Sequence, residues 1–136
     1  MDYLKPSIDK PACYAYIVVL MKKPASLGEF EQIVLLAILR LRDCAYGVSI
    51  RAEIAERTGR EVTPGALYTT LDRMEEKDLV RSWMGEATSE RGGRPKRYFA
   101  VTKAGRAALV NAHQAYQSLL EGLDFIGGAH ASSIIC

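Results

Sequence analysis

The chain has 136 residues, a formal net charge of +2, 49% hydrophobic and 25% charged residues, and three widely separated cysteines. These values are typical of one soluble globular domain and exclude a low-complexity chain or a disulfide framework. We therefore expect a reducing, cytoplasmic environment, no metal or other cofactor, and a buried, inert Cys44.

Residues 1–25 form an N-terminal extension of uncertain relevance. The apolar run in it, Ala12–Met21, is shorter than the roughly 20 residues that a membrane span needs, so we expect no membrane partner. The KKPAS sequence that follows is a poor signal-peptidase site. An extension unimportant to the fold is the favoured reading, ahead of a packing arm, with an export signal last.

Three helices are predicted next. Residues 29–43 carry a wide apolar face suited to the centre of a small domain, and residues 48–57 form a second helix that ends at Thr58-Gly59. Thr63-Pro64 opens the third helix, because threonine caps a free N–H and proline fits the first helical position. Its inward side chains are predicted to be Leu67, Leu71 and Met74, and its outward ones Thr69, Thr70, Arg73 and Glu76, with Tyr68 on the flank.

Two β-rich runs, 79–84 and 98–102, flank a basic turn that contains Gly92-Gly93. From Arg91 to Arg106 the sequence has six Lys or Arg residues and no acid. This local concentration of positive charge argues for a nucleic-acid partner more strongly than the net charge does. A helix beside a basic hairpin predicts a surface that reads a DNA groove and binds the neighbouring phosphates.

A long helix is predicted from Thr102 to about Phe125, roughly 36 Å at 1.5 Å per residue. A domain of this size cannot cover the whole apolar stripe, so we expect a second copy of the chain to cover it. The predicted dimer interface is Leu109, Ala112, Tyr116, Leu119, Leu120 and Leu123. Residues 127–136 are expected to fray into a disordered tail.

In this order and spacing, the segments LGEFEQIVLLAIL, Tyr46-Gly47, TPGALYTTLDRMEEKDLV and GRPKRYFAVTKAGRAAL resemble the PadR family of bacterial transcriptional regulators. The resemblance implies a mainly α fold with a small β-hairpin, namely a winged helix-turn-helix domain over 26–102 and a dimerisation helix over 103–126. It also implies a homodimer that binds a palindromic operator, usually represses, and is often relieved by a small molecule. The N-terminal residues and the single C-terminal helix depart from the commonest pattern.

The candidate DNA-binding residues come from the third helix and the basic turn. Thr and Arg side chains can reach base edges, and Lys and Arg can neutralise phosphates. The blander alternative is a solvated helix face and loop, and Arg97 could equally pair with an acid of the fold. The candidates are Thr63, Gly65, Tyr68, Thr69, Thr70, Arg73, Arg91, Arg94, Lys96 and Arg97.

Trp83 and Tyr116 are candidate lining residues for a small aromatic effector, although such side chains more often belong to a core or interface. No catalytic constellation is present, so we expect no enzyme. The sequence thus predicts a DNA-binding regulator. The alternative is a winged-helix interaction module whose basic hairpin binds an acidic protein.

Overall fold

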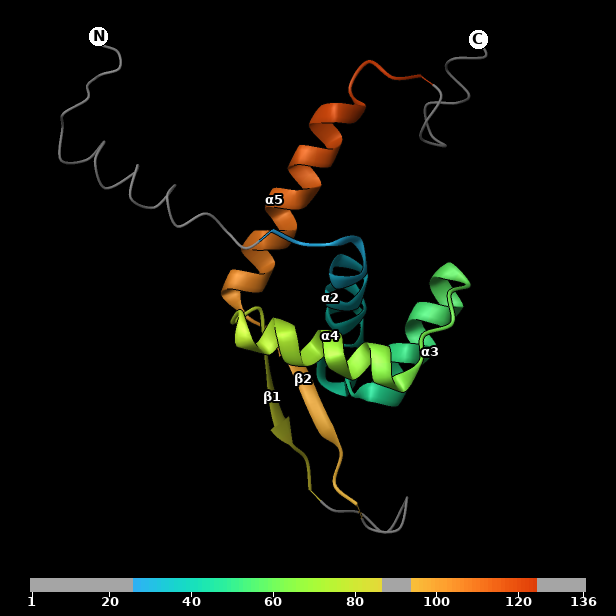
Figure 1. Cartoon of the computed structure of the whole chain (residues 1–136), viewed down its shortest axis with the longest axis vertical. Coiled ribbons are helices and arrows are strands. Elements are labelled where there is room, and N and C mark those ends of the chain that lie inside the picture. The colour runs from blue at the N-terminus through green and yellow to red at the C-terminus, as the bar shows by residue number, and fades with distance from the viewer. Residues whose placement is uncertain (1–25, 87–93, 125–136) are drawn as a thin grey trace, which may run out of the picture.

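The structure is a computed structural model that describes residues 26–86 and 94–124 (Figure 1). The elements, in order, are α2 (Glu29–Leu41), the 3-10 turn η1 (Arg42–Cys44), α3 (Gly47–Thr58), α4 (Pro64–Glu76), β1 (Val80–Met84), β2 (Arg97–Val101) and α5 (Lys103–Leu120). This is the predicted mainly α fold with one β-hairpin. The predicted N-terminal extension (1–25) and C-terminal tail (127–136) lie outside the described residues.

Helix α2 is the centre of the fold, and α3, α4, β2 and α5 all contact it. In Figure 1, α4 crosses in front of the lower end of α2 and α3 lies to one side. The apolar face predicted for α2 is confirmed, since Val34, Leu35 and Ile38 are almost completely buried. The other large buried side chains are Ile50, Ile54, Leu67, Leu71, Met74, Leu79, Val80 and Phe99.

The corner between α2 and α3 differs from the sequence prediction. Helix α2 ends at Leu41, two residues early, and the chain continues through η1. Cys44 lies in η1 and is exposed, so the prediction that it is buried is wrong. The 3-10 turn rotates the chain away from the periodicity of α2, and this turns the cysteine away from the core.

Local capping signals define α3 and α4 as predicted. The Thr63 hydroxyl accepts a hydrogen bond from the Ala66 N–H at 3.2 Å, and Pro64 occupies the first helical position. Gly59 ends α3 in a left-handed conformation, φ 73°, and its N–H donates to the Ala55 carbonyl. These caps fix where α4 begins, and hence which of its residues can face outward.

The two strands form an antiparallel hairpin in which Val80 pairs with Val101 and Met84 with Arg97. The hairpin is also bonded to the α2–α3 corner. The Phe99 N–H donates to the Ala45 carbonyl at 2.9 Å, and Tyr46 forms an isolated bridge with Tyr98. We call this hairpin, with the turn that joins its strands, the wing. Its second strand is therefore joined to the start of α3.

Helix α5 begins where predicted, with the Thr102 hydroxyl accepting a hydrogen bond from the Gly105 N–H at 3.0 Å. It ends at Leu120, whereas the sequence prediction carried it to Phe125. Glu121 leaves the helical path at ψ 130°, and Gly122, with φ 83°, completes a turn in which the Leu123 N–H donates to the Leu120 carbonyl. The helix has 18 residues, or about 27 Å, and Leu123 lies beyond its end.

Glu31 ties the start of α2 to the end of α4. Its carboxylate accepts from the Gly28 N–H at 3.0 Å and from the Lys77 ammonium at 3.2 Å, and the residue is buried. Burial raises the pKa of Glu31, but the Gly28 N–H, Lys77 and the Arg73 charge together bring this pKa below its ordinary value. The charged carboxylate therefore contributes to folding stability.

We expect Glu31→Gln to lower the free energy of unfolding at pH 7 by about 1–2 kcal/mol, through loss of the charge-assisted hydrogen bonds. Because the folded-state pKa of Glu31 is lowered, its contribution is complete above the unfolded pKa of about 4.3 and disappears as pH falls through the folded pKa. Urea unfolding of the wild type and of Glu31→Gln at pH 7 and pH 3 measures whether the difference between their free energies of unfolding disappears at low pH. The control is Glu29→Gln, whose side chain is 78% exposed; an equal loss in the control would contradict the assignment.

Candidate nucleic-acid interface

Helix α4 presents an exposed surface beside the core. Leu67, Leu71 and Met74 are buried, as predicted. The candidate residues Thr63, Gly65, Tyr68, Thr69 and Arg73 are exposed. The N-terminal half of this surface carries free backbone N–H groups and hydroxyls but no acid, a combination suited to phosphate and base edges.

Thr70 is not part of this surface. Its exposed fraction is 4%, so the prediction that it faces solvent is wrong. Thr70 lies next to Leu71 and three residues after Leu67, within the arc of α4 that packs on the core. A threonine is small enough to be buried there, and we remove Thr70 from the candidate contacts.

Arg73 and Tyr68 lie on different flanks of α4. Five helical residues separate them by about 140° around the helix axis. Lys77, one helical turn after Arg73, binds the Glu31 carboxylate at 3.2 Å, so this flank of α4 lies toward the start of α2. Tyr68 lies toward the hairpin, because its ring is 6.5 Å from that of Phe99 in β2. The outward arc between these flanks carries Gly65 and Thr69 in the N-terminal half of α4, and the acids Asp72 and Glu76 in its C-terminal half.

A groove of about 240 Å³ lies between the start of α3 and the wing, with Tyr68 of α4 at its border, and it brings several of the predicted residues together. Tyr68 comes from α4, and Arg94, Lys96 and Arg97 come from the wing. Its other lining residues are Tyr46, Gly47, Val48, Met84 and Pro95. The Lys96 ammonium lies 4.5 Å from the centroid of the Tyr46 ring, an arrangement that holds the cation at the edge of the groove.

Gly47 at the start of α3 permits this groove to form. A Cβ at this position would overlap the Tyr68 hydroxyl and come within 2.8 Å of the ring carbon that carries it. The tyrosine ring thus packs directly over the Gly47 backbone. This contact explains why a glycine follows Tyr46 at this point of the sequence.

The cations of the wing divide into two groups. Within the described residues, no acidic side chain forms an ion pair with Arg94 or Lys96. Arg97 instead pairs with Glu75 at 2.7 Å and with Asp72 at 3.4 Å, both on α4. Its alternative role as a partner for acids of the fold is therefore the one observed. Arg91 lies outside the described residues.

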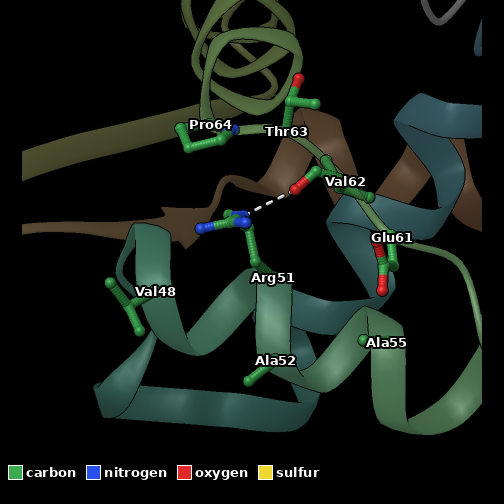
Figure 2. A pocket seen from close by; sticks show the side chains of 8 residues that line it. All are labelled: Val48, Arg51, Ala52, Ala55, Glu61, Val62, Thr63 and Pro64. Atoms are coloured by element: carbon green, nitrogen blue, oxygen red, sulfur yellow. Dashed lines mark hydrogen bonds between the residues drawn. The ribbon is translucent and has the colours of Figure 1, made fainter.

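A second groove, of about 570 Å³, lies between α3 and the segment that leads into α4 (Figure 2). Arg51 lies inside it, and its Nε donates to the Val62 carbonyl at 2.6 Å. Val48 lines this groove and the first one, so the two adjoin. The sequence analysis missed Arg51. The available signal was one cation on the outer face of α3, among Val48, Ala52 and Ala55.

The second half of α5 extends away from the rest of the fold (Figure 1). Among the candidate dimer residues, Leu109 lies in the first half of α5 and packs against the core, and Leu123 lies beyond the helix end. The exposed fractions of Tyr116, Leu119 and Leu123 are 64%, 79% and 45%, whereas Leu109, Ala112 and Leu120 are partly buried. Between α2 and α5 lies an open groove of about 750 Å³, lined in part by Leu36, Leu109 and Tyr116. A large apolar surface is thus left uncovered by residues 26–86 and 94–124.

The two candidate effector residues do not line one cavity. Trp83 stacks on Tyr98 in the hairpin, with ring centroids 6.0 Å apart, and Tyr116 lies on the distal half of α5. Figure 1 shows the hairpin and α5 extending in opposite directions. Tyr116 borders the groove between α2 and α5, which is large enough for a small aromatic molecule.

Residues 26–86 and 94–124 lack two other kinds of feature. No cluster of three or more His, Cys, Asp or Glu side chains there is arranged to hold a metal ion. In the same residues, no helix has both the length and the apolar character that crossing a bilayer requires.

The family model described as "Transcriptional regulator PadR-like family" matches residues 35–111, a segment that runs from α2 through the hairpin into α5. The chain belongs to the PadR-like family. Members of this family are transcriptional regulators that bind DNA, and the winged helix-turn-helix arrangement described above is the corresponding fold. The resemblance found in the sequence is confirmed.

Individual relatives agree with this assignment. The chain is 35% identical over 83 residues to the transcriptional regulator Rv3488 of Mycobacterium tuberculosis, covering 61% of this chain and 71% of that protein. It is 29% identical over 99 residues to "Uncharacterized protein X" of Lysinibacillus sphaericus, covering 71% and 86%. A solved PadR family transcription regulator from Clostridium difficile matches with a TM-score of 0.54 and 27% identity, over 66% of this chain and 90% of that one.

Proposed function

We propose that this PadR-family regulator is a homodimeric, sequence-specific repressor that inserts α4 into the major groove and places its wing on the adjacent phosphates. The observation that carries the proposal is the groove shared by Tyr68, Arg94 and Lys96 beside the acid-free N-terminal half of α4. A cationic groove beside an exposed helix start matches the two requirements of a DNA reader, phosphate binding and access to base edges.

Each group of side chains has its own role in this proposal. Thr63 and Gly65, at the start of α4, bind phosphate through free N–H groups. Thr69 and Arg73 reach base edges, where an arginine fork fits guanine O6 and N7. The phosphate contacts are Tyr68, Arg91, Arg94 and Lys96, and Arg51 joins them because its groove adjoins theirs.

The dimer forms through residues 103–126, which comprise α5 and the residues that follow it. Residues 26–102 read DNA. The exposed Tyr116, Leu119 and Leu123 support this division, because water contact with so much apolar surface is unfavourable. Two-fold symmetry would set the two α4 helices about 34 Å apart, one turn of DNA. A small aromatic effector bound beside Tyr116 would relieve repression by favouring a different spacing.

Selection of bound fragments from random duplex DNA tests the proposal directly. We expect a palindrome whose half-sites are one helical turn apart. On the selected duplex, the Arg94→Ala/Lys96→Ala variant should reduce the slope of log affinity against log salt by about 1.8, because each lost phosphate contact changes the slope by about 0.9. Fluorescence anisotropy at 50–200 mM salt measures this slope.

The matched control removes two exposed cations at the other end of β2, in Lys103→Ala/Arg106→Ala. This variant should retain the wild-type slope. An equal change in both variants would mean that the groove has no special role. If the wild-type protein binds no duplex at low salt, the DNA-binding proposal is wrong, and an acidic protein becomes the partner to test for the hairpin.

A further inference from the structure

We propose that Arg97 is a positioning residue that fastens the wing to α4, and that it does not bind phosphate. It lies beside Lys96 in the basic turn, but its surroundings differ from those of Lys96. The inference refines the proposed DNA-binding function, and its DNA measurements rest on that function.

Arg97 bridges three elements at once. Its Nη2 donates to Glu75 Oε1 at 2.7 Å and its Nη1 lies 3.4 Å from Asp72 Oδ1, both on α4. Its Nε donates to the Ser82 hydroxyl of β1 at 3.2 Å. We call Arg97, Ser82, Glu75 and Asp72 the clasp. An arginine is suited to this position, because its planar fork can satisfy several acceptors in fixed directions.

The clasp closes on itself through Ser82. The Ser82 hydroxyl donates to Glu75 Oε2 at 2.9 Å, so Glu75 binds both strands of the hairpin with its two carboxylate oxygens. The guanidinium of Arg97 also lies 4.9 Å from the centroid of the buried Phe99 ring. With only 33% of its side chain exposed, Arg97 is held from several directions. Such a network loses little further side-chain entropy for each added bond.

The clasp has two consequences for DNA binding. It fixes the angle between the hairpin and α4, and therefore the distance between the phosphate contacts and the base contacts. It also neutralises Asp72 and Glu75, whose carboxylates would otherwise repel the phosphates near α4. Arg97 raises the affinity by holding these groups, whereas Arg94 and Lys96 raise it by direct contact with DNA.

The direction in which Glu75→Gln changes DNA affinity distinguishes the two possible roles of Arg97, positioning and phosphate binding. In the wild-type background, Glu75→Gln breaks the clasp, so we expect affinity for the selected duplex to fall three- to tenfold. In an Arg97→Gln background the clasp is already broken, and Glu75→Gln removes an uncompensated acid, so affinity should rise. If Arg97 bound phosphate instead, Glu75→Gln would release Arg97 and raise affinity in the wild-type background as well. That result would overturn the proposal.

The salt dependence gives a second measure with a neighbouring control. Lys96→Gln should reduce the slope of log affinity against log salt by about 0.9. Arg97→Gln should weaken binding while leaving this slope within error of the wild-type value. Arg97→Lys keeps the charge but loses the fork, and we expect it to bind as weakly as Arg97→Gln. A slope reduced equally in Arg97→Gln and Lys96→Gln would contradict the inference.

A measurement without DNA separates failure of the clasp from failure of the proposed function. Arg97→Gln should speed amide hydrogen exchange at Trp83 and Tyr98 by about tenfold, because these two residues pair across the hairpin and their N–H groups face the opposite strand. The control is Arg81→Gln. Arg81 is the neighbour of Ser82 in β1, and its guanidinium lies over the Trp83 ring. Unchanged exchange in Arg97→Gln would refute the clasp even if the wild-type protein binds DNA. Faster exchange in a protein that binds no duplex would retain the clasp and reject the DNA-binding proposal.

Discussion

Gly105→Ala is expected to lower the free energy of unfolding by about 2 kcal/mol or more, with a fall in Tm of several degrees. In most helices this substitution stabilises by up to about 1 kcal/mol. Here the added Cβ would overlap the Leu79 carbonyl oxygen and come within 2.7 Å of Val101 Cγ1. The carbonyl belongs to backbone that also accepts from the Thr102 N–H, so it cannot move without breaking that bond.

Gly65→Ala is the control for this measurement, because a Cβ at Gly65 meets no atom within 4 Å. Its stability should be unchanged or slightly raised. Thermal and urea unfolding of the three proteins decide the outcome. A Gly105→Ala protein as stable as the wild type would show that α5 can shift on the hairpin without cost.

Leu119→Asp is expected to convert the proposed dimer into monomers. Leu119 is 79% exposed in the single chain, so the substitution should leave the fold of each protomer intact. In a dimer formed through α5, it would bury a carboxylate without a partner, at a cost of several kcal/mol. This corresponds to a dimer dissociation constant raised at least about 100-fold. Sedimentation velocity across a concentration series measures the change.

The matched variant Ser118→Asp places the same charge one residue earlier on α5, off the apolar stripe. It controls for the effect of an acid near a helix C-terminus. We expect Ser118→Asp to remain dimeric. If Leu119→Asp also remains dimeric, the interface lies elsewhere and the separation of the α4 helices must be derived again.

The features predicted correctly depend on short stretches of sequence. A helix cap is decided by three or four neighbouring residues, so Thr63-Pro64 and Thr102 gave the starts of α4 and α5. The core face of α4 followed from the spacing of its apolar residues. The same local logic explains one error, since Gly122 was an available stop signal for α5 and the apolar stripe beyond it was followed instead.

The remaining errors concern contacts between residues far apart in the chain. Thr70 is buried because the neighbouring elements cover a wider arc of α4 than its apolar side chains mark. Arg97 pairs with acids 22 and 25 positions earlier, and no pattern near Arg97 distinguishes it from Lys96. Arg51 was missed because its groove forms only when α3 packs beside the residues that precede α4.

The hydrogen bond from the Phe99 N–H to the Ala45 carbonyl and the Tyr46–Tyr98 bridge anchor β2 to the corner that starts α3. Further along, ion pairs to α4 hold the same stem. An arm supported at two points along its length is preorganised, so its encounter with a double helix requires little loss of internal freedom from the stem. Association would then approximate rigid-body docking, with a rate governed by long-range attraction and not by a folding step.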